Sequence, residues 1–250
     1  MSAMTMPRYR FLMAVGHIMA VALASLLTFA PELYGIVTMV YFVGFIAIFI
    51  FMSAKSALKS ATSKEAKEIR ASPVIISSNR KEVQELMFKD KKLTQELKAQ
   101  FSAMGLSFII PFIVIGMFFA YSTFVRPLFQ DADTPIKFLG FLIMYEIPIS
   151  FSQFMNYYVI RPRMKGFINI VRDFKVHQKG IWAPTIVLKF PLKGFRIRYS
   201  GVRKFVELIP QDKKGPAQMT MRFYTKHYDR FLEALKRHGE VRDSDIERVD

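Results

Sequence analysis

The chain has 250 residues, of which 52% are hydrophobic and 36 are Lys or Arg against 20 Asp or Glu, and it has no Cys. The absence of Cys excludes disulfides, iron–sulfur clusters and Cys-based zinc sites. The sequence also lacks the glycine motifs that bind phosphates or dinucleotides or carry a serine nucleophile, and its four His residues are not spaced as metal ligands. We therefore expect a protein without enzymatic activity, metal or cofactor.

Four apolar segments predict an α-helical polytopic membrane protein. Each is about 20 residues long, and a helix of that length spans the ~30 Å hydrocarbon core of a bilayer. The segments are residues 11–30, 34–53, 104–125 and 136–160. Only three residues, Pro31 to Leu33, separate the first two segments. This spacing predicts a tight hairpin of two transmembrane helices over residues 1–53, and a second pair of helices over 104–160.

The distribution of basic residues orients these helices. Lys and Arg outnumber Asp and Glu by 11 to 6 in residues 54–103 and by 21 to 10 in residues 161–250. Cytoplasmic segments of membrane proteins carry such an excess. We therefore expect a multi-pass protein of the plasma membrane with both termini in the cytoplasm. Arg8 and Arg10 before an apolar run also fit a cleaved signal peptide, but the run of residues 11–30 is long for one and favours a retained helix.

Residues 54–103 predict a cytoplasmic antiparallel hairpin of two coiled-coil-like helices. Pro73 ends the first helix, and Asn79 and Glu82 have the capping-box spacing that starts the second. Apolar residues recur in the second helix at heptad-like intervals, at Val83, Leu86, Leu93, Leu97 and Met104. At 1.5 Å per residue such an arm projects by about 25–30 Å.

The tip of this arm carries Val74, Ile75 and Ile76. Apolar side chains at an exposed tip indicate a contact surface. One interpretation is a docking site for a cytosolic partner, such as a ribosome or a targeting factor. The alternative is a solvated linker that only joins two spans.

Residues 161–250 predict a small cytoplasmic antiparallel β-domain that ends in a helix. Phe195, Ile197 and Tyr199 alternate with Arg, as in a half-buried strand, and residues 218–223 repeat the pattern. A helical stripe from Tyr228 closes the domain. This order of elements resembles a pleckstrin-homology-like domain. Its excess of basic residues favours contact with anionic lipid headgroups or ribosomal RNA. The alternative is that this charge only holds the topology.

A stripe of polar side chains runs along the last span. Glu146, Ser150 and Gln153 fall on one side of a helix, and Asn156 lies on a neighbouring strip. Polar groups at membrane depth face protein or a water-filled groove. The stripe is therefore either a hydrophilic groove open to the cytoplasm or packing between helices, with Glu146 protonated. We expect His17, in the first span, to be a packing residue.

The layout of residues 34–160 resembles the three-span core of the YidC/Oxa-type membrane protein insertase superfamily, particularly its small archaeal members. One span is followed by a charged hairpin, centred on RASPVIISSNRKEVQELMFKDKKL, and then by two closely spaced spans. The resemblance implies an insertase or assembly factor that receives newly made membrane proteins on the hairpin. Its polar groove would consist of Glu146, Ser150, Gln153 and Asn156. Bacterial members carry an Arg in this groove, and no span interior here does.

Two functions therefore remain open. The first is a membrane protein insertase or insertion factor. The second is a non-enzymatic, membrane-anchored scaffold or adaptor, whose basic β-domain binds lipid headgroups, protein partners or other membrane subunits.

Overall fold

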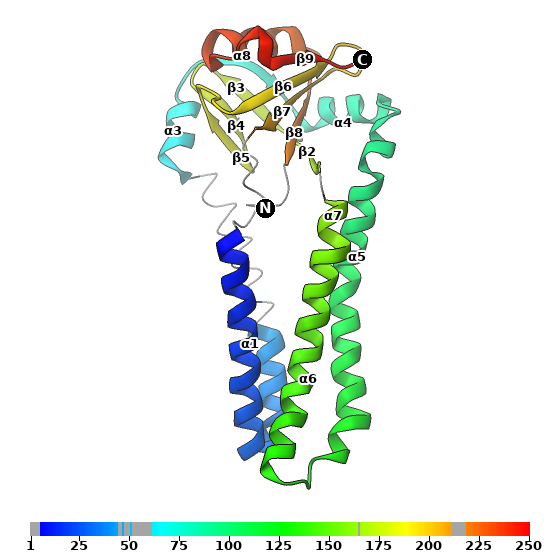
Figure 1. Cartoon of the computed structure of the whole chain (residues 1–250). Helices are drawn as coiled ribbons and strands as arrows, with labels where there is room; N and C mark the ends of the chain where they lie inside the picture. Colours follow the sequence, from blue (N-terminus) through cyan, green and yellow to red (C-terminus); the bar gives the residue numbers. More distant parts are fainter. Residues whose placement is uncertain (1–5, 45–46, 48–50, 52–61, 165, 212–218) are drawn as a thin grey trace. The chain divides into compact units, whose positions relative to one another are not determined.

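The computed structural model describes residues 6–44, 47, 51, 62–164, 166–211 and 219–250. The chain divides into two compact units (Figure 1). The β-unit comprises Phe51–Lys98 and Gly166–Asp250, and the membrane unit comprises Met4–Ile50 and Ala99–Lys165. The expected combination of a helical membrane part and a separate β-domain is confirmed.

The membrane unit contains long apolar helices joined by short turns. These are α1 (Met6–Phe29), the helical residues 34–44, α5 (Leu93–Ala120) and α6 (Thr134–Phe154). Both α5 and α6 continue as π-helical segments, Tyr121–Val125 and Met155–Ile160, and α7 (Arg161–Arg163) follows the second. The turns are the 3-10 helices Pro31–Leu33 and Arg126–Leu128.

Two helical stretches, Leu93–Leu128 and Thr134–Arg163, are long and apolar enough to cross a membrane. The pair Met13–Phe29 and Pro31–Gly44 is a further candidate, bent by 120° between its halves. Most of the second half of the second predicted span, after residue 44, lies outside the described residues. The number of four spans therefore stays a prediction.

Helices α1 and α6 pack closely because small residues line their contact. Ala20 and Ala24 of α1 are fully buried, and a Cβ placed on Gly16 would lie 3.9 Å from Ile149 of α6. Small residues at this spacing let membrane helices approach each other. At the other end of α6, a Cβ on Gly140 would lie 2.7 Å from the ring of Phe129, so only glycine fits there.

The β-unit has two sheets. Sheet A has the strand order β1-β3-β4-β5 and is antiparallel throughout. Sheet B has the order β2-β8-β7-β6-β9, with parallel pairs at both edges. The strands are β1 (Val74–Ser78), β2 (Ile168–Ile170), β3 (Phe174–His177), β4 (Gly180–Ala183), β5 (Ile186–Lys189), β6 (Phe195–Ser200), β7 (Phe205–Pro210), β8 (Thr220–Tyr224) and β9 (Ile246–Arg248). The helices are α3 (Lys64–Arg70), α4 (Arg80–Lys89) and α8 (Tyr228–Gly239), and a 3-10 turn, Asp243–Asp245, precedes β9.

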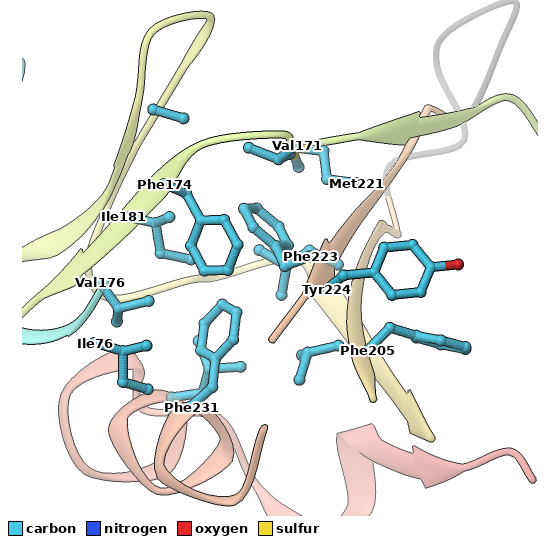
Figure 2. Close-up of a cluster of buried hydrophobic side chains, with 14 of the residues drawn as sticks. Ile76, Val171, Phe174, Val176, Ile181, Phe205, Met221, Phe223, Tyr224 and Phe231 are labelled. Carbon is cyan, nitrogen blue, oxygen red and sulfur yellow. The ribbon is translucent and has the colours of Figure 1, made fainter. Parts of the chain in front are cut away.

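A continuous apolar core joins the two sheets and α8. Figure 2 shows the rings of Phe174, Phe223 and Phe231 gathered at its centre. The centroid of Phe174 lies 5.0 Å from that of Phe223, and Phe231 lies 5.5 Å from Phe223. Such edge-to-face aromatic pairs add about 0.5–1.5 kcal/mol beyond the area that they bury. The strands expected around residues 195–199 and 218–223, and the closing helix, are present as β6, β8 and α8.

The prediction of a projecting helical arm over residues 54–103 is wrong for the residues that the structure describes. Val74–Ser78 forms a strand that pairs with β3, because the run of β-branched residues fits a sheet better than a helix end. Ile76 is only 3% exposed and Ile75 packs against the core, so of the expected docking tip only Val74, at 51%, is exposed. Asn79 does cap α4 by accepting a hydrogen bond from the Glu82 amide.

The heptad-like stripe has a different role from the one expected. Its buried members, Val83, Leu86, Leu93 and Leu97, join the core of the β-unit rather than a partner helix. The β-unit therefore combines residues 64–98 with residues from 166 onward, and 161–250 alone is an incomplete domain.

The two segments of the β-unit constrain the topology of the chain between them. A single folded domain lies on one side of a membrane, so the chain crosses the membrane an even number of times between Lys98 and Gly166. The helical stretches Leu93–Leu128 and Thr134–Arg163 are long and apolar enough to make two such crossings.

Candidate functional site

Three polar side chains meet between the apolar helices α1 and α6. Nδ1 of His17 lies 2.7 Å from Oε2 of Glu146, and Nε2 of His17 lies 3.1 Å from the amide nitrogen of Gln153. His17 thus bridges two residues of α6 that are seven positions, or about two helical turns, apart. We call these three residues the intramembrane cluster.

The intramembrane cluster is only half covered. The side chain of His17 is 41% exposed and that of Glu146 is 29% exposed in the isolated chain. The surface of α1 beside it, formed by His17, Ile18, Val21 and Ala22, is open and almost entirely apolar. In a bilayer, polar groups at such a surface require water, protein or a further hydrogen-bonding group in contact.

The structure splits the predicted polar stripe. Glu146 and Gln153 contact His17, whereas Ser150 and Asn156 are exposed and take no part in the intramembrane cluster. Asn156 lies in the π-helical segment Met155–Ile160, where the wider turn changes the spacing of side chains along the helix. Whether the stripe lines a hydrated groove stays a prediction.

His17, expected as a packing residue, is the centre of the cluster. The positions of His17 and Glu146 in the sequence already indicate a similar depth in the membrane. His17 lies 12 residues before the end of α1 at Phe29, and Glu146 lies 12 residues after the start of α6 at Thr134. If α1 ends and α6 begins at the same side of the membrane, both positions lie at the same depth, about 18 Å from that side at 1.5 Å per residue.

An apolar crevice lies on another side of α6. It has a volume of about 310 Å³ and is lined by residues of α5, of the π-helical segment after it and of α6, among them Met117, Tyr121, Phe124, Met144 and Pro148. The crevice offers shape and apolar surface but few polar groups.

The β-unit contains a buried ionic network between sheet B and helices α4 and α5. Arg203 donates to both carboxylate oxygens of Asp90 at 2.8 Å, and Arg222 donates to Glu207 at 2.7 Å. Both guanidinium groups also bind Glu96, in the first turn of α5. Asp90 and Glu207 have side chains 1% exposed, and every charge in the network has an opposite partner. The network therefore acts as a structural clamp between α4, α5 and sheet B.

The network also sets the protonation of Asp90. Burial alone would raise the pKa of Asp90, but the hydrogen bonds from Arg203 and Tyr224 and the nearby guanidinium charges outweigh it and lower the pKa below its usual value. The Tyr224 hydroxyl donates to Asp90 at 2.6 Å, and burial raises the pKa of that hydroxyl. Asp90 therefore stays ionised at neutral pH.

A basic surface covers the outer side of sheet A. Lys175 lies opposite Trp182 in the strand register, and the Arg70 guanidinium of α3 lies 5.5 Å from the centre of the Trp182 ring. Strand residues alternate between faces, so Lys175 and Trp182 point away from the core that holds Val176 and Ile181. Helix α3 packs on β4 and β5 from this side. The exposed cations here are Lys64, Lys67, Arg70, Lys175, Lys179 and Lys189. We call these six residues and Trp182 the basic face.

Few acidic groups oppose the basic face. Glu65 and Glu68 lie on α3, and Glu68 is paired with Lys189 at 2.9 Å. Gly180 allows the close packing of α3, because a Cβ there would lie 2.8 Å from Ile69 and 2.2 Å from the backbone oxygen of Leu188. Among the described residues, no group of three or more His, Asp or Glu side chains is placed to hold a metal ion.

A family model described as "Predicted membrane protein (DUF2208)" matches residues 11–238, which include both units of the structure. No curated protein matches the chain, and no solved structure does. The expectations of an insertase core and of a pleckstrin-homology-like domain therefore remain resemblances. By its sequence over most of its length, the chain belongs to the DUF2208 family of membrane proteins.

Proposed function

We propose that the protein is a non-enzymatic, membrane-anchored adaptor whose β-unit binds anionic lipid headgroups through the basic face. The observation that carries the proposal is a set of six exposed cations on α3 and on sheet A with its β3–β4 turn, of which Arg70 and Lys175 lie beside Trp182. The proposal places the β-unit on the cytoplasmic side of the plasma membrane, where anionic lipids are concentrated.

The charges of the basic face support this ligand class. Lys189 is paired with Glu68, which leaves five exposed cations against Glu65. A Lys or Arg close to an anionic membrane surface contributes about 1 kcal/mol. Trp182 is half-buried with its indole nitrogen covered, so its ring reports on the basic face but is not itself counted as a lipid contact.

The chain itself provides the reporter for a test, because Trp182 is its only tryptophan. The full-length protein is reconstituted in nanodiscs of zwitterionic lipid and in nanodiscs containing anionic lipid. We expect anionic lipid to shift the Trp182 emission to shorter wavelength and to shield it from a soluble quencher. High salt should reverse both changes, because it screens exposed charges.

Matched variants locate the effect. Changing Lys64, Lys67 and Lys175 together to Gln should abolish the response to anionic lipid. Changing Lys81, Lys91 and Lys92 to Gln removes the same charge from exposed positions elsewhere in the β-unit and should leave the response in place. Equal emission in both lipids would refute the proposal, and equal loss in both triple variants would mean that only total charge matters.

One observation favours a second candidate, a membrane protein insertase. The intramembrane cluster places a carboxyl group and an imidazole at membrane depth with side chains that are partly exposed. Together with the layout of residues 34–160, this supports a polar path for the flanks of client proteins. The incorporation of Val74–Ile76 into sheet A removes the docking arm from this hypothesis.

The insertase candidate is tested by insertion of a client with a polar N-terminal flank into proteoliposomes. Glu146→Leu should reduce insertion per folded molecule, while Ser150→Ala, a smaller change on the same helix, should have less effect. Normal insertion by Glu146→Leu would remove this candidate and leave the adaptor.

A further inference from the structure

Helices α5 and α6 follow each other in the chain, but they are not closely packed. Helix α6 packs along α1, whereas few residues of α5 lie near residues of α6. Large side chains keep the two helices apart. The rings of Phe118 and Tyr145 lie 5.6 Å from each other, and the Tyr121 hydroxyl donates to the carbonyl oxygen of Gly140 at 2.6 Å. The apolar crevice is the space that this separation leaves.

The crevice has the length of a lipid chain segment. Its lining on α5 and the following π-helical turn extends from Met117 to Val125. Eight residues rise by about 12 Å, which is most of the ~15 Å of hydrocarbon in one leaflet. Phe124 is 71% exposed and Ile147 is 47% exposed, so the crevice is open to its surroundings. At membrane depth these surroundings are lipid.

A cation without an acidic partner lies one residue beyond the crevice lining. Arg126 directly follows Val125, and its guanidinium group lies 4.4 Å from the centre of the Tyr34 ring. Its Nε is buried and has no hydrogen-bond partner, and among the described residues no carboxylate forms an ion pair with it. The half-buried side chain therefore has terminal nitrogens to offer to an acceptor. A guanidinium group is always charged in proteins and binds phosphate through parallel hydrogen bonds.

The acidic residues at this end of the helices suit the rest of a headgroup. They are Glu32, Asp131 and Asp133, and all three are exposed. Carboxylates attract an ammonium group and repel a phosphate. A headgroup that carries both groups, as phosphatidylethanolamine does, matches both signs of charge.

We propose that the membrane unit contains a binding site for one phospholipid molecule. The phosphate of this lipid accepts hydrogen bonds from Arg126, and one acyl chain lies in the crevice between α5 and α6. Arginine and tyrosine are typical of the level at which headgroups meet hydrocarbon, and Arg126 and Tyr34 lie together here. The site is separate from the basic face, which lies in the β-unit, so either proposal can fail while the other holds.

The test maps the lipid on the full-length wild-type protein. The protein is washed in detergent to remove loosely bound lipid, and phosphatidylethanolamine with a photoreactive group in one acyl chain is added. After illumination, the labelled peptides are identified by mass spectrometry. We expect label in residues 117–125 and 144–148. Phe108 and Phe112, which are 71% and 60% exposed on the same helix, serve as the reference. Equal labelling around these two residues would identify an ordinary lipid-facing surface and overturn the proposal.

The phosphate contact is tested with a second lipid and a pair of variants. Diacylglycerol with the same chains lacks the phosphate, so it should compete poorly for the site. Arg126→Gln should weaken phosphatidylethanolamine binding by about tenfold, as expected for the loss of a charge-assisted hydrogen bond. Lys137→Gln removes a cation near the start of α6 and should bind as the wild type does. Equal competition by the two lipids would overturn the proposal.

The acyl chain is tested by filling the crevice. Ala120→Phe places a ring among the lining residues and should abolish the labelling of residues 144–148. Ile115→Phe adds bulk to α5 outside the lining and should leave the labelling unchanged. Melting curves without added lipid show which variants are folded, and the labelling of the wild type requires no variant. Labelling of folded Ala120→Phe at the wild-type level would overturn the proposal.

Discussion

The two units of the molecule treat charged side chains in opposite ways. In the β-unit, Asp90, Glu207 and Arg222 are almost completely buried and each has an opposite partner within hydrogen-bond distance. In the membrane unit, Glu146 has His17 as its hydrogen-bonding partner, and both side chains are partly open to the surroundings. A buried network whose charges are all paired stabilises the fold, whereas a partly exposed pair has polar atoms left to bind a further group. The comparison therefore makes the β-unit network a determinant of stability and leaves the intramembrane cluster as a candidate functional site.

The largest expected effect comes from breaking the buried network. Arg222→Met leaves Glu207 and Glu96 without one of their cations in a buried environment. Removing one partner of a buried ion pair lowers stability by about 3–5 kcal/mol. Urea unfolding followed by Trp182 fluorescence measures the change. A loss below 1 kcal/mol would show that water enters the network and that the two units differ less than the structure indicates.

A second change tests the strand β1. Ile76→Ala opens a cavity in the core, and such changes destabilise by about 2–5 kcal/mol. Val74→Ala, two residues away and 51% exposed, should change stability by only about 0.5 kcal/mol. The same urea experiment gives both values. If both variants lose equally little stability, Ile76 is not buried and residues 74–76 form an exposed tip.

The pH dependence of the β-unit should follow Asp90. Its pKa in the folded state is lowered by Arg203 and Tyr224, so its contribution to stability is fully present above the unfolded pKa, near 3.8. The contribution is lost as pH falls through the lower, folded pKa. Stability measured at neutral pH and at pH values below about 3.8 should therefore diverge for the wild type. Asp90→Asn should be less stable than the wild type, and its stability should change less with pH.

The smallest effect is expected in the membrane unit. Glu146→Leu removes a partly exposed carboxyl group from apolar surroundings, while His17 keeps its contact with Gln153. Replacing polar groups of this kind by apolar ones is often neutral or stabilising. We expect a change within about 1 kcal/mol in melting of the detergent-solubilised protein. A loss of about 3 kcal/mol would mean that the cluster is sealed in its native setting and acts as packing, like the network of the β-unit.

Local patterns in the sequence predicted the elements that depend on local chemistry. The alternation at Phe195, Ile197 and Tyr199 gave β6, and the stripe from Tyr228 gave α8. The capping residue Asn79 was identified correctly. Strand β7 was missed, because Glu207 is the only polar residue in its FVELIP sequence, which therefore shows no alternation.

The errors came from contacts between distant segments. A helical stripe such as Val83, Leu86, Leu93 and Leu97 looks the same whether it faces a partner helix or a sheet, so sequence periodicity does not identify its partner. Val74–Ile76 likewise gives no sign that β3, about 100 residues later, pairs with it. Glu146 and Gln153 were recognised because polar residues are rare in apolar spans. His17 was undervalued because its partner lies 129 residues away.

The pairing of β1 with β3 has a consequence for how the protein is made. Residues 64–98 leave the ribosome before α6 and most of α5. The strands that pair with β1 follow only after both helices. Until Phe174 and Phe231 have been synthesised, Ile76, Val83 and Leu86 have no core to enter and remain available to chaperones or to misfolding. Closing this loop of about 100 residues is also slow compared with local folding. Biogenesis of this protein therefore has a fixed order, in which its membrane helices are synthesised before its water-exposed domain can fold.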